Sequence, residues 1–270
     1  MVPEKWTENF IDLNGVHICY HRTGGNKPPI ILLHGISDNG LCWTRVAKDL
    51  EKDFDVIMLD ARGHGKSTAA EMEFGFGLMA ADVAGLIQEL KLNKPILLGH
   101  SMGGQVATIV AGKYPDLVSK IVLEDPAYFL RSIEKLLIKV ANPLIRWMGK
   151  RNDEKTKEQV KTSCKKLHPT WIDDDLDPWV EAQKEFARNL KETVITRYDT
   201  AVDWHNVFSK VKVPVLFIIA SKGVYSVKRL KKILPEFADA KFQFINEAGH
   251  NIRREQYEQY MDAVRSFVHA

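Results

Sequence analysis

The sequence predicts an α/β protein with a mostly parallel, twisted sheet, helices on both faces of that sheet, and a helical cap inserted after the sixth strand. Three observations lead to this fold class. Short, continuous apolar runs are typical of strands buried on both faces, and segments with apolar residues at helical spacing separate them. One long, charged segment interrupts this alternation. Because strands that alternate with helices join through crossover connections, we expect a doubly wound sheet.

The sheet is expected to begin with an antiparallel hairpin. Residues 10–13 and 16–20 flank Asn14-Gly15, a dipeptide whose tolerance of positive φ favours a tight turn. Buried strands are expected at residues 29–33, 56–59, 95–98, 121–123, 213–219 and 242–245, and helices at residues 41–50, 78–90, 103–113, 227–234 and 256–268.

The strand alternation stops between residues 128 and 205, where the chain becomes charged and amphipathic. We expect helices in this segment, interrupted where proline removes a helical hydrogen bond. The expected breaks are Asn142-Pro143, His168-Pro169 and Asp177-Pro178. The chain should therefore form one core from residues 1–127 and 206–270, with a helical cap at 128–205.

Three tryptophans of this cap, Trp147, Trp171 and Trp179, are candidates for lining a substrate pocket. The alternative is that they pack helix against helix, which is the commoner fate of apolar residues at helical spacing. The sequence leaves both interpretations open.

Composition narrows the class of partner. The formal net charge is +3 with 27% charged residues, so basic and acidic residues nearly balance and no nucleic-acid partner is indicated. No apolar run reaches the roughly 20 residues of a membrane span, and residues 1–6 lack the pattern of a signal peptide. We expect a cytoplasmic protein that acts on a small molecule. The residues indicate no oligomeric state.

The cysteine pattern points to neither a disulfide framework nor a metal centre. Cys19, Cys42 and Cys164 are an odd number of cysteines at wide spacing, without a CxxC pair. Disulfide scaffolds and zinc cages need paired or clustered cysteines. No metal is therefore implied.

The strongest chemical signal is an apolar strand followed by Gly99-His100-Ser101-Met102-Gly103 and then a helix. This G-x-S-x-G pattern in this context is typical of a nucleophile elbow. Glycines on both sides let the chain turn sharply, so that the serine oxygen projects above the strand ends while the next helix points its N-terminus at the reaction centre. Ser101 is the candidate nucleophile.

At these residues the sequence resembles the α/β-hydrolase superfamily, and the resemblance extends over essentially the whole chain. His34-Gly35 looks like the dipeptide of the family's oxyanion loop, which implies backbone N–H donors from Ile36 and Met102. Residues 60–67 match the turn after the family's fourth strand, which is structural, so His64 is not expected to be catalytic.

The candidate base is His250. Gly249-His250 follows the expected strand at 242–245 and precedes the last helix, where the family keeps its catalytic histidine. The chain order, with serine first and histidine last, agrees with the family. The alternative is an ordinary histidine in a surface loop.

The acid departs from the family's commonest pattern, which places an aspartate just beyond the strand expected here at 213–219. No carboxylate occurs from Trp204 through Pro235. Some members carry the acid one strand earlier, where this chain has Asp125. A histidine base needs such a carboxylate to fix its tautomer. Glu124, which should project to the opposite side of the strand, remains an alternative, as do a purely turn-forming Asp125 and a site with no carboxylate.

A serine at the elbow argues against dehalogenases and epoxide hydrolases, which need a carboxylate there. In C–C hydrolases of ring-cleavage products an aromatic residue commonly follows the catalytic histidine, whereas Asn251 follows here. We therefore expect hydrolysis of a small to medium carboxylic ester or lactone through an acyl-enzyme, with no cofactor. The alternatives are a C–C bond hydrolase and a ligand-sensing, non-catalytic receptor.

Overall fold

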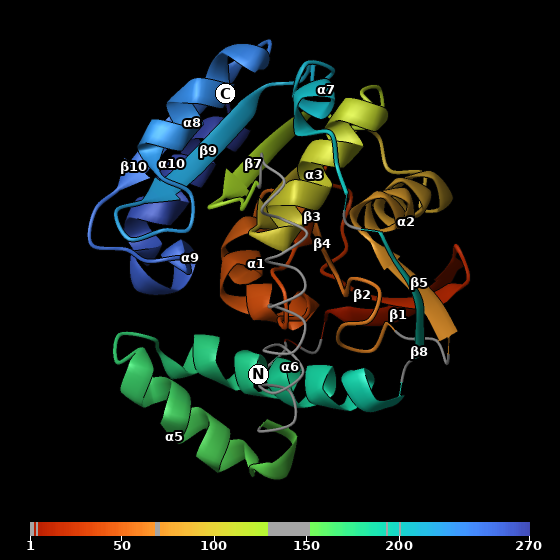
Figure 1. The fold of residues 1–270 in the computed structure, drawn as a ribbon, viewed down its shortest axis with the longest axis vertical. Coiled ribbons are helices and arrows are strands. Elements are labelled where there is room, and N and C mark those ends of the chain that lie inside the picture. Colours follow the sequence, from red (N-terminus) through yellow and green to blue (C-terminus); the bar gives the residue numbers. More distant parts are fainter. Residues whose placement is uncertain (1–2, 4, 68–70, 129–151, 193, 200) are drawn as a thin grey trace.

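The computed structural model describes residues 3, 5–67, 71–128, 152–192, 194–199 and 201–270. Its main sheet has eight strands in the order β1-β2-β4-β3-β6-β7-β9-β10 (Figure 1). The first two strands form the antiparallel hairpin expected around Asn14-Gly15, β2 pairs antiparallel with β4, and the other neighbours are parallel. The strands are β1 Thr7–Leu13, β2 Val16–Arg22, β3 Pro29–Leu33, β4 Asp55–Leu59, β6 Ile96–His100, β7 Lys120–Glu124, β9 Val215–Ala220 and β10 Ala240–Ile245.

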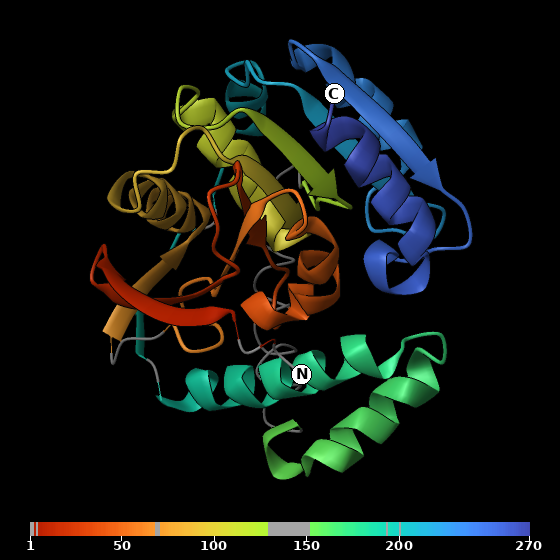
Figure 2. The same cartoon turned by 180° about the vertical axis from the view of Figure 1, so that it is seen from behind.

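Helices cover both faces of this sheet because its central strands are buried and apolar on both sides. Ile31 and Leu33 of β3 face one apolar cluster, and Ile30 and Leu32 face the other. Helix α3 lies in front of the sheet in Figure 1, and Figure 2 shows α10 in front of it from behind. The first cluster contains residues of α2 Phe76–Glu89, α3 Met102–Lys113, α7 Trp204–Phe208 and α8 Val227–Ile233; the second contains residues of η1 Gly40–Trp43, α1 Thr44–Leu50, α9 Ile252–Glu255 and α10 Tyr257–Val268. A short helix, η2 Leu234–Glu236, follows α8.

The predicted fold class is thus confirmed, and the segment 128–205 differs from expectation in two details. It contains a strand, β8 Val194–Asp199, which pairs in parallel with β5 Glu71–Gly75 in a separate two-stranded sheet. Helix α5 Lys157–Leu167 ends before His168-Pro169 as expected, but α6 Asp173–Glu192 continues through Pro178. The expected break at Asp177-Pro178 was wrong. Pro178 is the sixth residue of α6, so it removes one helical hydrogen bond, the one to the Asp174 carbonyl, and the helix continues past it.

Local capping explains where several helices begin. Thr156 and Gln159 form a reciprocal capping box at the start of α5. The side chains of Ser226 and Asp203 accept backbone N–H groups at the starts of α8 and α7.

Helices α5 and α6 lie next to each other on one side of the molecule, with α6 closer to the core (Figures 1 and 2). Trp147 and the dipeptide Asn142-Pro143 lie outside the described residues.

Candidate active site

Ser101 lies at a sharp turn between β6 and α3, as the elbow pattern predicts. Its backbone has φ 51° and ψ −111°, which is a strained conformation for a residue with a side chain. The flanking glycines permit the turn: a Cβ on Gly103 would lie 2.1 Å from the carbonyl oxygen of Leu33, and one on Gly99 would lie 2.3 Å from that of Gly103. Helix α3 begins at Met102, so its N-terminus points its free N–H groups toward Ser101.

Asp125 and His250 are in direct contact. His250 Nδ1 lies 2.6 Å from Asp125 Oδ2, although 124 residues separate them in the chain. Since a carboxylate only accepts hydrogen bonds, His250 carries its proton on Nδ1 and leaves Nε2 free to accept one. The described hydrogen bonds do not include one from Ser101 Oγ to His250, a contact that often forms in such sites only once substrate is bound.

The loop after β9 supports the Asp125 carboxylate with its backbone. The N–H groups of Val224 and Tyr225 donate to Asp125 at 2.7 Å and 3.1 Å. Gly223 packs against the same carboxylate, because a Cβ at this position would lie 2.7 Å from Asp125 Oδ1. This loop, where the acid would be expected on the family's commonest pattern, supplies hydrogen-bond donors instead. Asp125 itself is fully buried at a positive φ of 40°.

Glu124 projects away from His250 and pairs with Arg253. Its carboxylate accepts the Arg253 backbone N–H at 3.0 Å and the guanidinium at 2.9 Å. Arg253 also donates to Asp38, as does Arg254 at 2.9 Å. Burial alone would raise the pKa of Asp38, but the charges of Arg254 and Arg253 lower it. The two arginines of this buried charge network follow His250 closely in the chain.

Two further contacts hold the backbone around His250. His100 Nε2 donates to the His250 carbonyl oxygen at 2.9 Å, and Glu255 accepts the Gly249 N–H at 2.6 Å. Burial lowers the pKa of His100 well below its ordinary value, so this imidazole is neutral. Residues of the elbow and of α9 thus hold the loop that carries His250 in place.

The loop of residues 34–39, which follows β3, lies against the elbow. A Cβ on Gly35 would meet the His100 ring at 2.7 Å and Ser101 Cβ at 3.5 Å. Buried His34 accepts the Ala61 N–H on Nε2 and therefore donates from Nδ1 to the Gly35 carbonyl, at 2.8 Å. Ile36 follows Gly35 in this loop, and 45% of its surface is exposed to solvent. This is the position at which the sequence predicts an oxyanion donor, opposite Met102.

The other residues that the sequence singled out lie elsewhere. Trp171 and Trp179 pack with Cys164 and Leu176 in an apolar cluster within the segment 128–205, and Trp171 also stacks on Arg254. Their part in substrate binding stays a prediction. His64 is buried, and its Nδ1 lies 3.1 Å from the carbonyl oxygen of Arg62.

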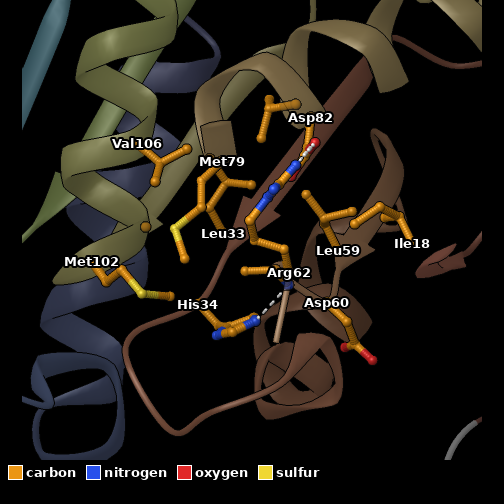
Figure 3. A pocket seen from close by; sticks show the side chains of 13 residues that line it. Ile18, Leu33, His34, Leu59, Asp60, Arg62, Met79, Asp82, Met102 and Val106 are labelled. Atoms are coloured by element: carbon orange, nitrogen blue, oxygen red, sulfur yellow. Dashed lines mark hydrogen bonds and ion pairs between the residues drawn. The ribbon is translucent and has the colours of Figure 1, made fainter. Parts of the chain in front are cut away.

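A small cavity lies behind the elbow, lined by His34, Met102 and Gly103 and by the Arg62–Asp82 ion pair (Figure 3). Its volume of about 20 Å³ has room for one water molecule, so it is too small to hold a substrate. The described residues contain no cluster of three His, Cys, Asp or Glu side chains that could hold a metal ion, and none of their helices is long and apolar enough to cross a bilayer.

Sequence reasoning did not find Gly223, Arg253 or Glu255. Gly223 lies in the loop after β9, which contains no carboxylate. Its role becomes visible only in the folded chain, where Asp125 lies against it. Arg253 and Glu255 lie three and five residues after His250, in a stretch that reads as an ordinary charged helix.

Comparisons with known proteins identify the family. Residues 28–253 match the family model described as alpha/beta hydrolase fold. The chain is 26% identical over 277 residues to N-formylmaleamate deformylase of Pseudomonas putida, covering 96% of this chain and 95% of that protein. It is 26% identical over 267 residues to a serine hydrolase-like protein of Danio rerio, covering 89% and 81%. The solved structure of an enol-lactonase from Burkholderia xenovorans has a TM-score of 0.73 at 22% identity, covering 97% of this chain and 100% of that one. The matched residues span most of the chain, so this protein belongs to the α/β-hydrolase fold family.

Proposed function

We propose that this protein is a serine hydrolase that cleaves a small to medium carboxylic ester or lactone through an acyl-enzyme. One observation carries the proposal: the 2.6 Å contact between Asp125 and His250, at the same edge of the sheet as the strained Ser101. In this assignment Ser101 is the nucleophile, His250 the general base and Asp125 the acid that orients it.

In the first half-reaction Ser101 Oγ attacks the carbonyl carbon of the ester while its proton passes to His250 Nε2. Asp125 stabilises the imidazolium that forms and keeps the proton on Nδ1 in place. The carbonyl oxygen becomes an oxyanion between the backbone N–H groups of Ile36 and Met102. Each such donor contributes about 3 kcal/mol to stabilising the transition state.

The tetrahedral intermediate then collapses. The bond between the carbonyl carbon and the leaving alkoxide breaks, and His250 gives its proton to the leaving oxygen, so that an acyl group remains on Ser101. In the second half-reaction His250 takes a proton from water, and the resulting hydroxide attacks the acyl carbon to form a second tetrahedral intermediate. Collapse of this intermediate releases the carboxylic acid, and His250 returns its proton to Ser101. The sequence of steps requires no cofactor.

The substrate class follows from the chemistry of the site and from the segment 128–205. We propose that this segment is a cap over the carboxyl edge of the sheet, where open α/β sheets bind ligands. A cap of this modest size with aromatic residues favours small to medium acyl or aryl groups over long-chain fats. Relatives named as a deformylase and a serine hydrolase-like protein support acyl hydrolysis in general terms.

The test is a substrate panel with the purified protein. p-Nitrophenyl acetate and butyrate, a lactone, an N-formyl amide and a dienoate ring-cleavage product would be assayed side by side. Turnover of an ester or lactone at more than ten times the rate on the other classes supports the proposal. Preferred cleavage of the dienoate would reassign the protein to C–C hydrolysis. Binding without turnover of any substrate would favour the receptor alternative.

A further inference from the structure

Ser37, in the loop of residues 34–39, has a backbone conformation that residues with side chains rarely adopt. Its φ is 64°, and the N–H of Asp38 donates to the Gly35 carbonyl at 3.2 Å, which closes a tight turn around Ile36 and Ser37. A turn with positive φ at its third residue normally has glycine there. Such strain persists only where the surroundings fix the conformation.

The contact that fixes Ser37 comes from the segment 128–205. Gln183, in the middle of α6, is buried, and its Nε2 donates to the Ser37 carbonyl at 2.9 Å and to Ser37 Oγ at 3.1 Å. The orientation of the amide is set from its other end, because Asn152 Nδ2 donates to Gln183 Oε1 at 3.1 Å. Both ends of this one side chain are therefore satisfied.

Helix α6 is itself held firmly against the core, with Gln183 midway along it. Near its start Asp175 pairs with Arg45 of α1 at 3.1 Å, and near its end Asn189 donates to the Gly65 carbonyl at 2.9 Å. Glu185, two residues after Gln183, accepts from Asn39 at 2.8 Å. Both views place α6 along the core rather than apart from it (Figures 1 and 2).

We infer that Gln183 is a positioning residue that sets the direction of the Ile36 N–H, so that α6 contributes to the rate of hydrolysis and not only to substrate access. This inference rests on the proposed function, in which Ile36 is an oxyanion donor. Ile36 and Ser37 share one turn, and a relaxed Ser37 would rotate the adjoining peptide units. Because oxyanion donors act only within a few tenths of an ångström of the correct place, this rotation lowers the rate.

The experiment compares Gln183→Met with Asn189→Leu. Both changes replace a buried amide on α6 by an apolar side chain of similar size, but only Gln183 contacts the 34–39 loop. Thermal unfolding should change by a similar amount in both variants. For Gln183→Met we expect kcat on an ester to fall between about 10-fold and 100-fold, while KM stays within a factor of about two. This loss of kcat is smaller than the roughly 1000-fold upper limit for losing a whole oxyanion donor. Asn189→Leu should stay within a factor of about three in kcat.

A second change separates positioning from general loosening. Glycine adopts positive φ without strain, so Ser37→Gly should reduce the dependence on Gln183. The effect of Gln183→Met on kcat should shrink to less than about threefold in the Ser37→Gly background. An equally large loss in that background, or equal losses of kcat in Gln183→Met and Asn189→Leu, would overturn the inference.

The rate at which an organophosphonate modifies Ser101 gives a readout that does not depend on ester turnover, because its phosphoryl oxygen occupies the same donor site. Gln183→Met should slow this reaction by the same factor as kcat. If the wild-type protein is modified at Ser101 yet turns over no ester or lactone, the proposed function fails while the role of Gln183 is still decided by the modification rates. If Ser101 of the wild-type protein is not modified, both are wrong.

Discussion

Glu124 and Asp125 are adjacent carboxylates that bind different partners. Asp125 contacts His250 at 2.6 Å, and Glu124 forms a buried ion pair with Arg253 at 2.9 Å. Both carboxyl groups are completely buried, so burial does not distinguish them. Their partners distinguish them, and these partners imply different consequences when each carboxylate is replaced by its amide.

Asp125→Asn should remove most of the activity, and it should also cost some stability because the amide can accept only one of the two backbone N–H groups that the carboxylate accepts. The amide cannot stabilise the imidazolium, and it favours the wrong tautomer of His250; in a serine protease the same change lowers turnover by about 10⁴-fold. Steady-state rates on an aryl ester, with circular dichroism to check folding, measure this. An Asp125→Asn variant with full turnover would show that the site works without this carboxylate.

Glu124→Gln should lower the stability and leave most of the activity. Removing one partner of a buried ion pair costs about 3 kcal/mol or more, because the remaining charge is left uncompensated. Arg253 keeps its contact with Asp38, so we expect the lower end of this range. Urea unfolding measures the loss of stability, and kcat of the folded variant should stay within about tenfold of the wild type. Loss of turnover in this variant alone would move the acid to Glu124.

Ser101→Ala should abolish hydrolysis, with a loss of roughly 10⁶-fold in kcat if the three groups act as a unit. Ser209→Ala, at an exposed serine whose Oγ donates to the Asn206 carbonyl, is the control and should behave as the wild type. Mass spectrometry after treatment with an organophosphonate should recover the label on the peptide that contains Ser101. A label on another peptide would identify a different nucleophile.

Gly223→Ala tests the support that the loop after β9 gives to Asp125. The new Cβ would lie 2.7 Å from Asp125 Oδ1, and the carboxylate cannot move without losing His250 or the Val224 and Tyr225 N–H groups. We expect kcat to fall by at least tenfold. Gly77→Ala is the matched control, since nothing lies within 4 Å of its Cβ, and in helix α2 it should stabilise the protein by up to about 1 kcal/mol. Equal activities in the two variants would contradict the role assigned to Gly223.

The sequence predicted those parts of the fold that depend on local pattern. The central strands of the main sheet are short apolar runs bounded by turn residues, and the helices between them have regular apolar spacing, so their positions agree with the sequence prediction to within a few residues. The pairing of β5 with β8 was not predicted. Glu71–Gly75 is short and polar at alternate positions, and its partner lies more than 100 residues away, so no local pattern joins them.

The candidate site shows the same division. Ser101 and His250 stand in motifs that are contiguous in sequence, and strand alternation already separates the directions of Glu124 and Asp125. Gln183 has no such signal: it is a glutamine within an amphipathic, charged helix, and only the folded chain brings it against Ser37, 146 residues away. Supporting contacts of this kind are set by tertiary packing and leave no pattern along the chain.

The last prediction concerns the pH dependence of stability, which the buried histidines dictate. His64 is completely enclosed beside Phe186 and His34, and burial lowers its pKa to about 3. In the unfolded chain its pKa is the ordinary 6.5. Because the folded pKa is the lower one, the contribution of His64 to stability is fully present above pH 6.5 and is lost as the pH falls toward 3.

The loss should amount to about 1.4 kcal/mol for each pH unit below 6.5. Other buried groups titrate in the same range. Burial raises the pKa of Asp60 to about 7, for example, and the contribution of Asp60 to stability changes with pH in the opposite direction.

The wild type is therefore compared with His64→Asn, whose amide can still donate to the Arg62 carbonyl but carries no titrating proton. The variant should be less stable at pH 7, because it loses the ring contact with Phe186. The difference in unfolding free energy between the two proteins, measured in urea from pH 6.5 to 4.5, should shrink and then reverse as the pH falls. A difference that stays constant over this range would mean that His64 is protonated, or reached by solvent, in the folded protein.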